Sequence, residues 1–190
     1  MTGSTQSYAE TKPKHRSKFD HKTLALRGTD FLRVLFVCTG NTCRSPMAEA
    51  IFRQLASQHL NCAEERLREH GIDVFSAGVS AADSEPASSN AVKVLHNRGI
   101  SLSQHLSQQV TDEMLVQSDW ILAMTANHLR ILQNARPDLA TKMRLVCRDG
   151  LSISDPIGGD LSEYATCADE ITSCVKTFLD ETLKKDTEAK

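Results

Sequence analysis

The chain has 190 residues, of which 40% are hydrophobic and 24% charged, and a formal net charge of -2. These values are typical of one globular domain with a buried core. The small net charge argues against a nucleic-acid partner, and no apolar run approaches the roughly 18 residues of a membrane span. Because no secretory signal stands at the start, the sequence predicts a cytoplasmic protein.

Residues 1–30 form a polar segment with six basic and three acidic side chains, which gives about +3 against about -5 for the rest of the chain. This composition predicts a disordered N-terminal extension. A transit peptide is the alternative, although the acidic residues disfavour it. We expect a folded domain over residues 31–186 and a short C-terminal tail over 187–190.

Beyond the extension, short apolar runs typical of strands alternate with segments of helical periodicity. This alternation predicts an α/β fold: a single-domain, three-layer sandwich with a four-stranded parallel sheet flanked by helices. The predicted strands are 33–38, 72–78, 118–125 and 142–147, and the predicted helices are 45–58, 87–99 and a long last helix with Tyr164, Ala168, Ile171, Val175 and Phe178 on one face.

Six cysteines occur in a chain that is too long and too rich in core residues to be a disulfide scaffold. No pair has the spacing of a zinc site, so no metal is expected. Cys167 and Cys174 lie two turns apart on a predicted helix, roughly 10 Å along its axis, which is too far to bridge. We expect these two to be small core residues.

The segment Cys38-Thr-Gly-Asn-Thr-Cys-Arg44 joins the first predicted strand to the first predicted helix. In parallel sheets, ligands bind at such carboxyl ends of strands. Gly40 and Asn41 tolerate positive φ, so the backbone can turn successive amides inward. Inward amides and the positive end of a helix together form an anion site.

Two side chains add chemistry to this loop. Arg44 offers a planar fork for two phosphate oxygens, and the field that binds the anion also favours the thiolate of Cys38. Ser45, the expected helix cap before Pro46, can donate a hydrogen bond to that thiolate. The arrangement is that of a nucleophile beneath a tetrahedral anion; the alternative is a buried cysteine before an ordinary turn. The segment lacks the signatures of Walker and dinucleotide loops.

The string VCTGNTCRSPMAEA resembles the active-site loop of the low-molecular-weight protein tyrosine phosphatases. SAGV at 76–79, ILAMT at 121–125 and DPIGGD at 155–160 resemble later landmarks of that family. The resemblance implies a phosphocysteine mechanism without metal or cofactor, acting on a phosphorylated protein. It implies that Cys38 is the nucleophile, Arg44 the phosphate ligand and Asp155 the acid and then the base. The remaining substrate-binding residues would be Thr39, Gly40, Asn41, Thr42, Cys43 and Ser45.

Alternatives remain for two of these residues. Asp155 precedes a proline, and an Asp-Pro pair can simply start a turn before the last helix. By the family resemblance, Cys43 can pair with Cys38 and protect it from irreversible oxidation. The alternative is that Cys43 only fills space in the loop.

The loop sequence is most similar to the bacterial protein arginine phosphatases within this family. A hydroxyl at Thr42 suits a polar guanidinium better than the apolar ring of phosphotyrosine. Ile157 departs from both branches, because it stands where an aromatic residue is usual. From the loop sequence and Thr42 we expect phosphoarginine as the substrate, with phosphotyrosine as the alternative.

Two other functions fit the sequence less well. An arsenate reductase needs further relay cysteines, and the sequence has none between Gly78 and Met143. A non-catalytic phospho-residue binding module would be expected to lack the thiol, the arginine or the acid. Asp83 and Asp119 are other possible acids, but neither lies on a loop anchored by proline. His96, His105, His128 and Trp120 are expected to be structural.

Overall fold

The computed structural model describes residues 31–183, so the expectations for residues 1–30 and 187–190 lie outside the described residues. Four parallel strands form one sheet in the order β2-β1-β3-β4. They are β1 (Leu32–Cys38), β2 (Ile72–Gly78), β3 (Trp120–Ala123) and β4 (Met143–Leu145). The four-stranded parallel sheet is thus confirmed.

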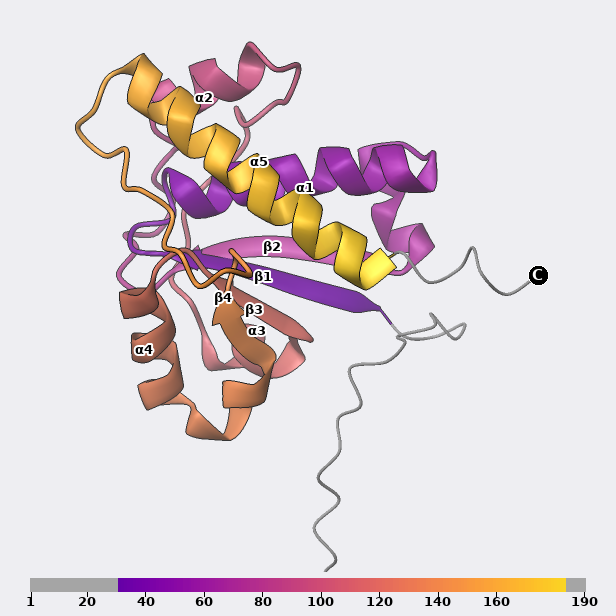
Figure 1. Cartoon of the computed structure of the whole chain (residues 1–190), viewed down its shortest axis with the longest axis vertical. Helices are drawn as coiled ribbons and strands as arrows, with labels where there is room; N and C mark the ends of the chain where they lie inside the picture. The colour runs from indigo at the N-terminus through magenta and orange to yellow at the C-terminus, as the bar shows by residue number, and fades with distance from the viewer. Residues whose placement is uncertain (1–30, 184–190) are drawn as a thin grey trace, which may run out of the picture.

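Helices cover both faces of the sheet (Figure 1). One layer holds α1 (Arg44–Leu60), α2 (Ser89–His96) and α5 (Leu161–Leu183), and the other holds α3 (Asp112–Gln117) and α4 (Ala126–Ala135). Two 3₁₀ helices, η1 (Glu64–His70) and η2 (Pro137–Lys142), complete the described elements. Among residues 31–183, no helix has the length and apolar character needed to cross a bilayer.

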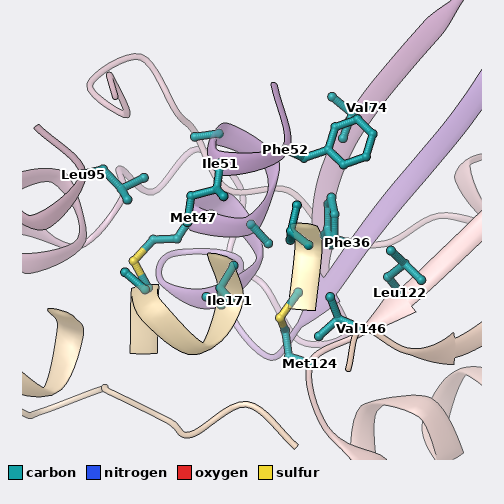
Figure 2. Packing of buried hydrophobic residues seen from close by; sticks show 14 of the residues in the cluster. Phe36, Met47, Ile51, Phe52, Val74, Leu95, Leu122, Met124, Val146 and Ile171 are labelled. Atoms are coloured by element: carbon teal, nitrogen blue, oxygen red, sulfur yellow. The ribbon is translucent and has the colours of Figure 1, made fainter. Parts of the chain in front are cut away.

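Strand β1 is apolar because it is buried on both sides. Val34 and Phe36 belong to the buried cluster that includes residues of α1 and α5, whereas Leu35 and Val37 belong to the cluster that includes residues of α3 and α4. Phe36 meets Phe52 of α1 with 5.9 Å between ring centroids, and Figure 2 shows this part of the core. The two clusters hold β1 rigidly, so its carboxyl end is a firm base for the loop that follows.

The apolar face predicted for the last helix is confirmed, since all five of its residues are buried. Phe178 on this face meets Trp120 edge-on at 5.8 Å, so Trp120 is a structural residue as expected. This apolar face packs α5 against α1 and α2, which positions the segment that precedes α5.

Two expectations about single residues are wrong. Helix α1 begins at Arg44, so Ser45 lies inside the first turn and is not the cap; its hydroxyl turns toward Cys38 instead. Cys174 is not a small core residue, because it forms a disulfide with Cys147, with 4.8 Å between the Cα atoms. The partner lies just after β4, and no spacing along the last helix could reveal it. Cys167 is buried as expected.

Candidate active site

The loop between β1 and α1 is fixed by main-chain hydrogen bonds from the chain after β2. The amides of Val79 and Ser80 donate to the carbonyls of Cys38 and Thr39, both at 2.9 Å. A Cβ at Gly78 would overlap the Thr39 carbonyl oxygen, so only glycine allows this approach. The SAGV segment therefore serves to support the loop.

Asn41 determines the curvature of the loop. It has a positive φ of 54° and is fully buried, whereas the expected positive φ at Gly40 does not occur. Its Nδ2 donates to Ser45 Oγ and to Ser76 Oγ, each at 2.9 Å, and its Oδ1 accepts from the Gln108 amide at 3.0 Å. One side chain thus joins α1, β2 and the 100–110 segment.

The Cys38 thiol lies buried at the base of this loop. Its Sγ accepts from the Asn41 amide at 3.2 Å and lies 3.0 Å from Ser45 Oγ. The Ser45 hydroxyl also reaches the Ala77 carbonyl at 3.3 Å, but a charged sulfur is the stronger acceptor for its single proton. Two donors can therefore stabilise a thiolate here.

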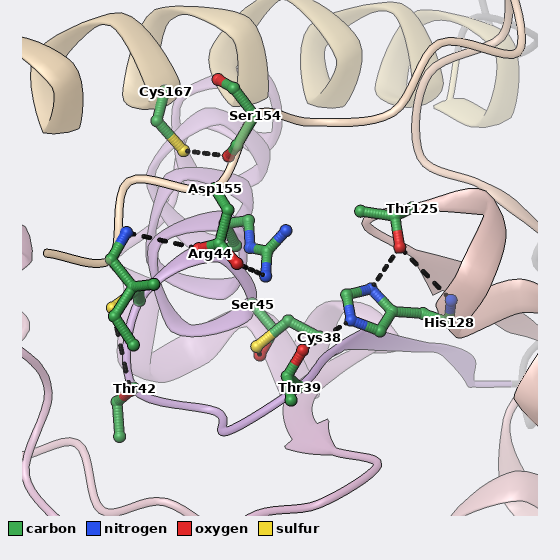
Figure 3. A network of polar contacts seen from close by, with 12 residues as sticks. Cys38, Thr39, Thr42, Arg44, Ser45, Thr125, His128, Ser154, Asp155 and Cys167 are labelled. Atoms are coloured by element: carbon green, nitrogen blue, oxygen red, sulfur yellow. Dashed lines mark hydrogen bonds and ion pairs between the residues drawn. The ribbon is translucent and has the colours of Figure 1, made fainter. Parts of the chain in front are cut away.

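Arg44 and Asp155 meet beside the loop (Figure 3). Arg44 Nη2 donates to Asp155 Oδ2 at 2.6 Å, although 111 residues separate them. Arg44 is only 5% exposed, while the Asp155 side chain is about half exposed. Asp155 also accepts from the Ile157 amide at 3.3 Å, which holds the Asp-Pro turn. The structure thus brings together the three residues singled out from the sequence.

The other acidic candidates lie elsewhere. Asp119 accepts from the Arg33 amide at 2.8 Å, near the opposite, amino end of β1. Asp83 accepts from the Gln109 amide at 3.1 Å. Of the three carboxylates, Asp155 is the one in contact with Arg44 at the end of the loop between β1 and α1.

Cys43 is buried one residue before α1 and faces α5. Its thiol donates to Ser88 Oγ at 3.3 Å and lies 3.3 Å from the Tyr164 hydroxyl. Burial, and then the contact with Cys43, raise the pKa of Tyr164. Thr42 is half-buried, and its carbonyl accepts from the Ser88 amide at 2.9 Å. Cys38 and Cys43 are both free thiols in this structure.

Two of the histidines expected to be structural hold the loop. His105 Nε2 lies 2.7 Å from the Asn41 carbonyl, and His128 Nε2 lies 2.8 Å from Thr39 Oγ1. Burial, followed by the Arg44 charge, lowers the pKa of His128 to about 4, while Asp155 opposes this change. No spacing rule points to these side chains, because they reach the loop from other elements.

The fold and the site define a class of protein. A thiol with two donors lies in a tight loop at the carboxyl edge of a parallel sheet, and the loop ends at a buried arginine that contacts a carboxylate. This set can attack a bound phosphoryl group, stabilise its charge and move a proton. The class is a cysteine-dependent phosphatase.

A family profile described as low molecular weight phosphotyrosine protein phosphatase matches residues 33–189. The chain belongs to this family, and it is a protein phosphatase. The resemblance noted in the sequence is thereby confirmed.

Three similar proteins place the chain within the family. The protein-arginine-phosphatase of Bacillus subtilis is 36% identical over 158 residues, which cover 80% of this chain and 97% of that protein. The tyrosine phosphatase structure from T. tengcongensis has 38% identity and a TM-score of 0.70, covering 79% and 99%. A YwlE arginine phosphatase mutant with a phosphorylated active-site serine has 32% identity and a TM-score of 0.70, covering 83% and 99%.

Proposed function

We propose that this protein removes phosphate from phosphoarginine side chains, with Cys38 as nucleophile, Arg44 as phosphate ligand and Asp155 as acid and base. One observation carries the catalytic assignment. Cys38 Sγ lies within hydrogen-bond distance of the Asn41 amide and the Ser45 hydroxyl, in the loop that ends at Arg44. The Arg44–Asp155 contact of 2.6 Å supplies the proton-transfer group beside it.

In the first step, the Cys38 thiolate attacks phosphorus and the bond from phosphorus to the arginine nitrogen breaks. The departing guanidine is strongly basic, so it leaves when Asp155 gives it a proton. Arg44 and the loop amides bind the equatorial oxygens as charge builds on them. The product is a phosphocysteine and a free arginine side chain.

In the second step, the Asp155 carboxylate takes a proton from water and the resulting hydroxide attacks phosphorus. The bond from sulfur to phosphorus breaks, which returns the thiolate and releases inorganic phosphate. The Ser45 hydroxyl, 3.0 Å from the sulfur, stabilises the departing thiolate. Thr39, Gly40, Asn41, Thr42 and Cys43 form the wall of the substrate site with Ser45.

The choice of phosphoarginine rests on Thr42 and on the relatives. Thr42 is half-buried in the loop, where its hydroxyl can accept from a guanidinium. The Bacillus subtilis relative is named a protein-arginine-phosphatase. Phosphotyrosine is the second candidate, because the T. tengcongensis relative of 38% identity is named a tyrosine phosphatase.

The test is phosphate release from a phosphoarginine protein and a phosphotyrosine peptide in parallel, with Cys38→Ser as the blank. We expect wild type to prefer phosphoarginine and Thr42→Val to lose about tenfold of that preference. Thr42→Ser is the matched control and should keep it. A wild-type preference for phosphotyrosine would overturn the substrate assignment, and activity in Cys38→Ser would overturn the mechanism.

We also assign a redox role to Cys43. Peroxide would convert the Cys38 thiolate to a sulfenic acid, and the Cys43 thiol would then displace water to form a disulfide. Its buried place in the same loop supports this role. After peroxide treatment, mass spectrometry should find a 38–43 disulfide in wild type. An activity assay should show that Cys43→Ser loses its activity irreversibly under the same treatment. Full recovery of Cys43→Ser by a thiol reductant would contradict the role.

We also propose a cytoplasmic location. It has a consequence for the Cys147–Cys174 disulfide, because the cytosolic glutathione pool keeps most thiols reduced. Thiol trapping in intact cells should therefore find this pair reduced. A pair that is oxidised in cells would contradict the proposed location.

A further inference from the structure

His128 lies in the first turn of α4, beside the catalytic loop, and is 3% exposed. Each ring nitrogen reaches a threonine hydroxyl: Nε2 lies 2.8 Å from Thr39 Oγ1, and Nδ1 lies 3.0 Å from Thr125 Oγ1 (Figure 3). A ring bonded on both sides has a fixed orientation. None of the catalytic steps described above uses it.

The protonation state of this ring determines which hydrogen bonds it can make. Burial and the Arg44 charge lower the pKa of His128 to about 4, and Asp155 only partly opposes them. The imidazole is therefore neutral at neutral pH. A neutral imidazole carries one N–H, so one of its nitrogens donates and the other accepts.

Thr125 contacts both the start of α4 and the second ring nitrogen through one hydroxyl. Its Oγ1 caps α4 by accepting from the His128 main-chain amide at 3.3 Å. The hydroxyl keeps one proton to donate, and among the contacts of residues 31–183 its acceptor is Nδ1 at 3.0 Å. When the Thr125 proton points to Nδ1, the proton of the ring lies on Nε2, which then donates to Thr39 Oγ1.

We propose that His128 is a positioning residue that occupies a lone pair of the Thr39 hydroxyl and so directs the Thr39 proton to an oxygen of the bound phosphoryl group. Thr39 directly follows Cys38 and is exposed at the edge of the loop. In Figure 3 its hydroxyl lies between the imidazole and Cys38. Without the Nε2–H donor, the same hydroxyl would be free to turn away from the site.

The inference rests on the proposed function, because it requires a phosphoryl group above Cys38. It does not depend on the leaving group, since the Thr39 contact is to a phosphoryl oxygen. Inorganic phosphate and every phosphorylated substrate should therefore be affected alike. This separates the role of Thr39 from that of Thr42, which acts on the arginine part of the substrate.

The first measurement is the protonation of the His128 ring in the wild-type protein, by long-range ¹H–¹⁵N correlation spectra of the histidine side chains. We expect a proton on Nε2 and a bare Nδ1 at neutral pH. A ring with the proton on Nδ1 would overturn the proposal, because Thr39 would then have to donate to Nε2 and could not donate to phosphate.

The second measurement compares paired variants. Thr39→Val removes the hydroxyl, and its control Thr39→Ser keeps it. The side chain of His128→Asn is too short to contact Thr39, whereas that of its control His128→Gln places an amide donor near the position of Nε2. We expect Thr39→Val and His128→Asn each to raise the inhibition constant of inorganic phosphate about tenfold. The two control variants should stay within about threefold, and Thr39→Val should add little to His128→Asn.

Other outcomes are decisive in the opposite direction. A folded Thr39→Val variant that binds phosphate as tightly as wild type would contradict the proposal. A loss of activity in the Thr39 and His128 variants that is confined to phosphoarginine substrates would also contradict it. If His128→Asn does not fold, the Thr39 pair and the ring protonation still decide. Failure of the proposed function would look different: wild type would bind phosphate and show the expected tautomer, yet release none from phosphoarginine protein.

Discussion

The Arg44 guanidinium and the Asp155 carboxylate lie 2.6 Å apart, from Nη2 to Oδ2, across 111 residues of sequence. This contact joins the residue that we propose binds phosphate to the residue that we propose moves the proton. An incoming phosphoryl dianion competes with Asp155 for the same guanidinium, so binding of the substrate is expected to free the carboxylate for the leaving group.

Asp155→Asn should lower kcat most for substrates with basic leaving groups, because these depend most on protonation. We expect a loss of about 10²-fold or more for phosphoarginine and a much smaller loss for an aryl phosphate with an acidic leaving group. Steady-state rates over a series of leaving groups provide the measurement. Asp83→Asn, an exposed carboxylate away from the loop, is the control; equal losses over the whole series would exclude the acid role.

Asn41→Gly should keep the left-handed backbone but lose the three side-chain hydrogen bonds that hold the loop. We expect a loss of about 2–3 kcal/mol in the free energy of unfolding and a clear fall in kcat. Urea unfolding and steady-state kinetics measure the two effects. Asn61→Gly is the matched control, because Asn61 also has a positive φ but is exposed at the end of α1. A similar response of both variants would contradict the bracing role of Asn41.

The low pKa of His128 predicts a loss of stability in acid. The unfolded chain binds a proton near the ordinary histidine value of 6.5, whereas the folded chain binds it only near 4. Stability from this group is therefore present above pH 6.5 and falls by about 3 kcal/mol as the pH decreases toward 4. Urea unfolding of wild type and His128→Gln over this range measures the difference, and parallel pH curves would argue against it.

The Cys147–Cys174 disulfide closes a loop of 27 residues and anchors the chain after β4 to α5. We expect the double variant Cys147→Ser/Cys174→Ser to lose about 3 kcal/mol of stability. A dithiol should lower the melting temperature of wild type toward that of the double variant. Cys62→Ser, which removes a half-exposed free thiol, is the control. A melting temperature insensitive to both changes would show that the bond contributes nothing.

Ile157→Phe should increase activity on aryl phosphates. Ile157 is 69% exposed and lies two residues after Asp155, so a ring there can stack on an aromatic substrate. Such stacking contributes about 0.5–1.5 kcal/mol, which predicts a rise of about twofold to twelvefold in kcat/KM for a phosphotyrosine peptide. Leu151→Phe, at another exposed apolar position of the same segment, should leave kcat/KM unchanged. A rise of kcat/KM in both variants would indicate non-specific hydrophobic binding instead of a specific contact at residue 157.

Much of the fold could be predicted because its signals are local. Strand β1 is an uninterrupted apolar run, and α5 carries its apolar stripe at helical spacing, so both could be assigned from periodicity. Helix α3 has only six residues, too few for a periodic signal, and Ser45 was misplaced because a cap depends on the backbone of the preceding turn.

The strand, the loop and the helix that hold Cys38 and Arg44 could be assigned from sequence alone, because these residues are close in the chain and the elements have local signals. Their contacts with the rest of the chain follow from tertiary packing. Asp155, His128 and the Cys147–Cys174 pair take their places through the packing of α5 and α4 on the sheet. Contacts between residues so far apart in sequence depend on how whole elements pack, and no local pattern records that.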